Sequence, residues 1–132
     1  MATIFSKIIN GEIPCYKITE NEDFIAFLDI NPLQKGHTLI VPKVEVDYIF
    51  NNSDETLSKI LIFAKKVAQA IEKSIECKRI GLTVIGLEVP HTHIHLIPII
   101  HEKDISFTGK RISFTAEEFI NLTEKIKSNL KD

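Results

Sequence analysis

The stretch from Val89 to Pro98 constrains the fold more than any other part of the chain, because three histidines alternate along it. Successive side chains of a β-strand point to opposite faces, so His91, His93 and His95 would line one face of a strand. In a helix the same rings would be spread around the axis and share no face. The apolar residues around them favour a strand, and the two prolines are typical of strand ends or edges. The stretch therefore predicts a strand that presents a row of imidazoles.

Such a row indicates a reactive site rather than a packed core. Neighbouring ionisable rings disfavour one another's protonation and titrate together, which core packing does not require. The residues alone leave two kinds of chemistry open. Three histidines can bind a metal such as zinc, although the run holds no carboxylate and Glu88 lies just outside it. Alternatively, one imidazole attacks a phosphorus atom while its neighbours protonate the leaving group and fix the tautomer.

Length and composition bound the kind of protein that carries this stretch. The 132 residues predict one domain over 1–132, with the composition of an ordinary globular chain. A net charge of −2 gives no electrostatic basis for broad nucleic-acid binding, and no apolar run approaches the roughly 20 residues of a membrane span. The N-terminus resembles neither a signal peptide nor an acylation signal, and Cys15 and Cys77 fit reduced thiols. We expect a cytoplasmic protein without nucleic-acid or membrane partners.

Hydrophobic periodicity predicts an α+β fold with a five-stranded antiparallel sheet. Strands that mostly follow one another in sequence, with one long helix between them, favour antiparallel pairing. A short helical opening is expected at 3–9. The strands are expected at 16–19, 24–28, 37–42, 81–85 and 89–98.

Two capping signatures locate the longer helices. Asn52 followed by Glu55 has the spacing of a capping box and predicts the start of a long amphipathic helix that ends near 78–79. Thr115 with Glu118 has the same spacing and opens a C-terminal helix that runs to about residue 130.

The histidine run resembles the motif of the histidine triad (HIT) superfamily, in which apolar residues separate and follow three histidines. Thr92 departs mildly from that pattern. The segments 4–14, 26–32 and 36–43 resemble, in order, blocks of the Hint-like branch, the histidine triad nucleotide-binding proteins. The likeness covers about residues 3–98, with the C-terminal helix beyond it. It implies an antiparallel five-stranded sheet with two helices and a homodimer whose sheets join.

The resemblance also implies roles for individual residues. His93 would be the nucleophile that forms a nucleotidyl-histidine at the α-phosphate. His95 would face the scissile bond and help charge balance or leaving-group protonation, while His91 and His37 would orient the rings and relay protons. Asp29 would accept both ribose hydroxyls, as a carboxylate with two oxygens can. Val89 would offer backbone to the phosphate, and the base pocket would be walled by Ile4, Phe5, Ile8, Phe27, Leu28 and Ile30.

The chain departs from the family pattern near the phosphate. Glu88 stands where members typically carry a small hydroxyl residue, and the loop at 84–87 is short and apolar. A carboxylate aimed at a phosphate would weaken binding. Our hypothesis is that Glu88 faces the leaving group and favours amines; the alternative is that it points into solvent. The zinc-binding cysteines of some bacterial members are missing, with Ser6 in one expected place.

The resemblance therefore implies a hydrolase or nucleotidyl transferase for purine nucleotides of the AMP or GMP type, with nucleoside phosphoramidates as the first choice of substrate. Dinucleoside polyphosphate hydrolysis is one alternative. A nucleotide-binding or sensing module with little turnover is another. No cofactor and no metal-binding set is expected, and chelation would abolish activity only in a metal-dependent hydrolase.

Overall fold

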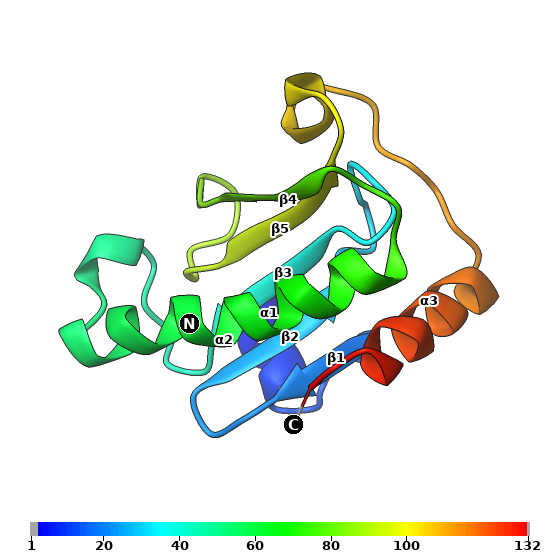
Figure 1. Cartoon of the computed structure of the whole chain (residues 1–132). Helices are drawn as coiled ribbons and strands as arrows, with labels where there is room; N and C mark the ends of the chain where they lie inside the picture. Colours follow the sequence, from blue (N-terminus) through cyan, green and yellow to red (C-terminus); the bar gives the residue numbers. More distant parts are fainter. Residues whose placement is uncertain (1–2, 132) are drawn as a thin grey trace.

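The computed structural model describes residues 3–131, which form a five-stranded antiparallel sheet with helices on both faces (Figure 1). The strand order is β1-β2-β3-β5-β4, so β5 lies between β3 and β4. The predicted α+β fold with an antiparallel sheet of five strands is thus confirmed. The strands are β1 Lys17–Glu20, β2 Phe24–Leu28, β3 Thr38–Pro42, β4 Arg79–Thr83 and β5 Ile94–Ile99; the helices are α1 Ile4–Ile9, α2 Asp54–Ser74 and α3 Ala116–Ser128, with 3₁₀ turns at Ile49–Asn51 and Glu102–Ile105.

The alternation of side chains along β2 builds two cores, one on each face of the sheet. Phe24, Ala26 and Leu28 contribute to the larger core together with α2 and α3. Ile25 and Phe27 point to the opposite face, where they pack in a smaller cluster that includes residues of α1. All five residues of β2 are buried as a result. Figure 1 shows α2 lying across one face of the sheet, with α1 behind it.

The start and end of the long helix were predicted wrongly. Ser53, not Asn52, caps α2: its hydroxyl accepts a hydrogen bond from the backbone N–H of Thr56. The Asn52 amide instead donates to the Thr92 hydroxyl at 2.9 Å, a long-range bond that the capping pattern could not reveal. The helix ends at Ser74 because the next residue, Ile75, is extended and the chain then enters β4.

The C-terminal helix begins as predicted. The Thr115 hydroxyl accepts from the N–H of Glu118, and the Glu118 carboxylate accepts from the N–H of Thr115. The rings of Phe114 and Phe119 lie 5.5 Å apart and close the hydrophobic staple. No helix within residues 3–131 is long and apolar enough to cross a membrane.

Four strands differ from the prediction at one or both ends. β1 lies one residue later, at Lys17–Glu20, β3 starts one residue later, at Thr38, and β4 lies two residues earlier, at Arg79–Thr83. The largest difference is in β5, which begins only at Ile94, so the expected strand at 89–98 is half loop. Pro98 lies within β5 opposite Ile80, beyond the last residue of β5 that pairs with β3.

Candidate active site

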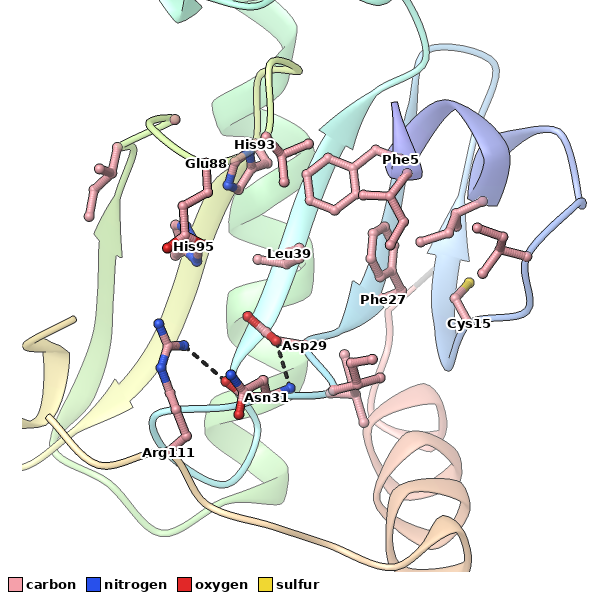
Figure 2. A pocket seen from close by; sticks show the side chains of 18 of the residues that line it. Phe5, Cys15, Phe27, Asp29, Asn31, Leu39, Glu88, His93, His95 and Arg111 are labelled. Carbon is pink, nitrogen blue, oxygen red and sulfur yellow. Dashed lines mark hydrogen bonds between the residues drawn. The ribbon is translucent and has the colours of Figure 1, made fainter. Parts of the chain in front are cut away.

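A pocket of about 460 Å³ opens between the sheet face that carries α1 and two irregular loops (Figure 2). That volume is within the range of small-molecule sites. One side, the sheet wall, consists of Phe5, Phe27, Asp29, Leu39, His93 and His95. The facing side, the loop wall, consists of residues 85–88 with Phe107 and Arg111. The pocket is lined by these predicted residues: Ile4, Phe5, Ile8, Phe27, Leu28, Asp29, Ile30, Glu88, Val89, His93 and His95.

The histidine run does not form the predicted row along a strand. Only His95 belongs to β5, whereas His91 and His93 lie in the loop before it. Thr92 explains the difference, because its N–H and its hydroxyl both donate to the carbonyl of Val46, each at 2.7 Å. The connector after β3 therefore takes the hydrogen bonds that a neighbouring strand would otherwise make. The rings of His93 and His95 still meet, with centroids 4.9 Å apart.

Backbone carbonyls fix the orientation of the first two rings. A carbonyl can only accept, so His91 donates from Nε2 to the Pro42 carbonyl at 2.8 Å. His91 Nδ1 then accepts from the hydroxyl of Thr3, which also caps α1. In the same way His93 donates from Nδ1 to the His91 carbonyl at 2.8 Å. Neutral His93 therefore has its lone pair on Nε2.

A second chain of hydrogen bonds fixes the tautomer of His95. The N–H of Leu33 donates to His37 Nδ1 at 3.0 Å, so the proton of neutral His37 is on Nε2. That proton is donated to His95 Nδ1, also at 3.0 Å. Neutral His95 must then carry its own proton on Nε2. His37 and His91 lie outside the pocket lining and are almost fully buried, so both contact the pocket only through neighbouring residues.

Burial keeps three of these rings neutral near pH 7. Desolvation lowers the pKa of His37 to about 3 and that of His95 to about 3, with smaller contributions from Arg111 and from repulsion between the neighbouring imidazoles when they are protonated. Desolvation also lowers the pKa of His93, opposed by its hydrogen bond to the His91 carbonyl and by the charges of Asp29 and Glu88. A lone pair on His93 Nε2 is therefore available at neutral pH.

Asp29 lies at the end of β2, beside the histidines. Its Oδ1 accepts from the N–H of Asn31 at 2.8 Å, and its Oδ2 lies 3.5 Å from His37 Nε2. Ligand atoms of Asp29, His37 and His95 lie within 4.8 Å of one another, which is compatible with metal binding. However, the facing nitrogens of the two histidines already form a hydrogen bond with each other.

Phe5 joins the histidines to the apolar part of the sheet wall. Its ring packs edge-on against His93 at 4.9 Å and against Phe27 at 5.9 Å. Sequence reasoning missed Leu39, which lies on this face of β3, and Cys15, which precedes β1 and also lines the pocket. Ile13, Pro14, Asn31, Ile85, Gly86 and Leu87 also line the pocket.

Phe107 and Arg111 were missed for a different reason. Their segment is polar and irregular, and no periodicity predicts where it lies. The Phe107 ring packs edge-on against His95 at 4.7 Å, and the guanidinium carbon of Arg111 lies 5.4 Å from the centre of that ring. Arg111 Nη1 donates to the Asn31 carbonyl at 2.9 Å, which holds the segment against the end of β2.

Comparisons with known proteins identify the family to which this fold belongs. The family model described as HIT domain matches residues 10–102. The chain is 35% identical over 133 residues to a protein of Schizosaccharomyces pombe named adenosine 5′-monophosphoramidase, covering 99% of this chain and 100% of that one. It is 36% identical to an uncharacterized HIT-like protein of Borreliella burgdorferi, covering 96% and 97%. A solved Hit-like protein from Bartonella henselae superposes with a TM-score of 0.83 at 30% identity, covering 97% and 96%.

The match of the family model over most of the chain, and relatives of this identity along nearly the whole length, establish the family. The chain belongs to the HIT domain family.

Proposed function

We propose that this protein is a hydrolase or nucleotidyl transferase for purine nucleoside phosphoramidates, and that a nucleotidyl group is carried on His93 Nε2. One observation carries the proposal: the bond from His93 Nδ1 to the His91 carbonyl leaves a lone pair on Nε2 in a pocket lined by His95. The family membership and the name of the Schizosaccharomyces pombe relative support the same chemistry.

The reaction would proceed in two displacements. In the first, the Nε2 lone pair of His93 forms a bond to the α-phosphorus while the P–N bond to the amine breaks. The electron pair leaves on nitrogen, which takes up one proton from solvent and accepts a hydrogen bond from His95 Nε2–H as charge develops. In the second, water attacks phosphorus, the electron pair returns to His93 and one proton is released. The products are a nucleoside monophosphate and an amine.

The sheet wall supplies the groups that would hold the nucleotide. Phe5 and Phe27 provide an apolar surface for a purine, with Ile4 and Ile8 of α1 beside them. Asp29 lies between this surface and His95, where its free carboxylate oxygen could accept from ribose hydroxyls (Figure 2). The apolar surface, the carboxylate and the imidazoles thus line one pocket, and they are the groups that a base, a ribose and a phosphate would each need.

Intact mass spectrometry tests the proposal most directly. The protein is mixed with adenosine 5′-phosphoramidate and quenched at short times, beside a His93→Ala variant. We expect a transient mass increase of one adenylyl group in the wild type and none in the variant, with turnover at least about a thousandfold slower in the variant. Turnover that persists in the variant would contradict the assignment of His93. AMP binding without adduct or turnover for any leaving group would favour the nucleotide-binding module.

A further inference from the structure

Arg111 is the one lysine or arginine among the described residues that line the pocket. Arg111 takes no part in the two displacements proposed for the reaction. The other charged groups of the lining are Asp29 and Glu88, which are both carboxylates. Without Arg111 the pocket would therefore present only negative fixed charge to a ligand.

The histidines of the lining do not offset this negative charge. Burial holds the pKa of His95 near 3 and lowers that of His93, so both rings of the lining are neutral near pH 7. A phosphate monoester carries a charge of about −1.5 to −2 at that pH. Moving such a charge from water into a partly closed site is unfavourable unless cations or hydrogen-bond donors compensate it.

The geometry places Arg111 where it can compensate a phosphate. Figure 2 shows its guanidinium below His95 and across from Asp29 and Asn31. The guanidinium is held over the Phe107 ring and by one hydrogen bond, from Nη1 to the Asn31 carbonyl. Within residues 3–131 no carboxylate lies at ion-pair distance from it. Its remaining N–H groups are therefore available to a ligand, on a side chain whose position is already fixed.

We propose that Arg111 binds the phosphate of the nucleotide and so provides the contact that the residue at position 88 and its short loop lack. The inference rests on the proposed function in one respect, because it takes a nucleotide as the ligand. The planar guanidinium can donate two parallel hydrogen bonds to two phosphate oxygens, which the single ammonium of a lysine does not reproduce. Arg111 would thus set the affinity for the charged end of the ligand and leave the base and ribose to the sheet wall.

Calorimetric titration with AMP and with adenosine tests this, because the two ligands differ only in the phosphate. We expect Arg111→Gln to weaken AMP binding at least about tenfold while the affinity for adenosine changes much less. Arg111→Lys should recover only part of the loss. Affinity for AMP should fall with added salt in the wild type and fall less steeply in Arg111→Gln. A residue that only tied down its segment would affect both ligands alike.

Lys110→Gln is the matched control, since it removes one exposed cation from the adjacent position and should retain the wild-type ratio of AMP to adenosine affinity. An unchanged ratio in Arg111→Gln would overturn the inference. Arg111-dependent AMP binding without any adenylyl adduct on His93 would overturn the proposed function and uphold the inference. A wild type that binds neither ligand would overturn both.

Discussion

The two walls of the pocket are built in different ways. Phe5, Phe27, His93 and His95 of the sheet wall are at most 7% exposed, and each is held by packing or by directed hydrogen bonds. In the loop wall Ile85 is 45% exposed and Leu87 is 89% exposed. The difference indicates that the proposed reacting groups are placed by the fold itself, whereas Ile85 and Leu87 of the loop wall are nearly free of packing. Substitutions in the sheet wall would then change the reaction, and substitutions in the loop wall would change the choice of substrate.

The largest expected effect concerns two buried imidazoles, that of His95 in the sheet wall and that of its hydrogen-bond partner His37. His37 and His95 take up a proton near pH 6.5 in the unfolded chain but only near pH 3 in the native protein. Between these values the unfolded state binds more protons, so the free energy of unfolding should fall as pH drops from 6.5 toward 3. Each ring can contribute up to about 1.4 kcal/mol per pH unit.

Urea unfolding at pH 7, 6, 5 and 4 measures this slope. His37→Asn removes one of the two rings and should flatten the curve, whatever its effect on stability at pH 7. A variant that retained the full wild-type slope would show that His37 does not titrate as its burial implies. The slope would then have to come from His95 or from other titrating groups.

The next effect compares packing in the two walls directly. Phe5→Ala should lower the free energy of unfolding by about 3–5 kcal/mol, because it leaves a cavity between Phe27 and the rings of His91 and His93. Leu87→Ala, in the loop wall, should change it by no more than about 0.5 kcal/mol. Chemical denaturation of both variants gives the comparison. Similar losses would mean that the loop wall is packed after all.

A smaller effect is expected for Asp29, the only carboxylate of the sheet wall. Asp29→Asn keeps the size of the side chain but removes the charge that would accept from the ribose, so AMP should bind about tenfold more weakly. For 2′-deoxy-AMP, which lacks one donor, the loss should be smaller. Calorimetric titration of the wild type and of Asp29→Asn with AMP and with 2′-deoxy-AMP measures the loss of affinity for each ligand. An equal loss for both would indicate that Asp29 acts through His37 and not through the sugar.

The smallest effect is expected for Glu88 in the loop wall. If its carboxylate faces the leaving group, Glu88→Ser should lower the preference for adenosine 5′-phosphoramidate over ADP about two- to fivefold, as for other exposed charges. Steady-state kcat/KM for the two substrates measures the preference. Leu87→Ser is the control at the adjacent exposed position. Unchanged selectivity in Glu88→Ser would mean that the carboxylate points into solvent.

Much of the sheet wall could be predicted from the sequence. Most of its residues lie on or directly beside regular elements whose periodicity and resemblance to the family indicate their direction, and Phe5, Phe27 and Asp29 all line the pocket. The prediction that was wrong there concerned the start of β5 among the histidines. That boundary depends on the bond from the Thr92 N–H to the carbonyl of Val46, which is more than forty residues away in the chain.

The part of the loop wall in residues 101–113 could not be predicted, because long-range bonds decide the course of that segment. The N–H of Ile112 donates to the Pro32 carbonyl at 2.8 Å, and Arg111 donates to the carbonyl of Asn31. No local pattern in residues 101–113 indicates that this segment lies across the pocket. A single sequence cannot show which of its several cations reaches the site, and Arg111 emerged only from the structure.

The bond between Asn52 and Thr92 has a consequence for how such sequences can diverge. Both side chains are buried, and the Thr92 hydroxyl accepts from Asn52 while it donates to the Val46 carbonyl. Replacing Thr92 alone by an apolar residue would leave one N–H of the buried Asn52 amide without its acceptor, because the other N–H is already donated to the Ile49 carbonyl, whereas replacing both residues could be nearly neutral. The unusual threonine between the histidines should therefore co-vary with the residue two positions before α2. A sequence that regains an apolar residue at position 92 should also have lost the asparagine at 52.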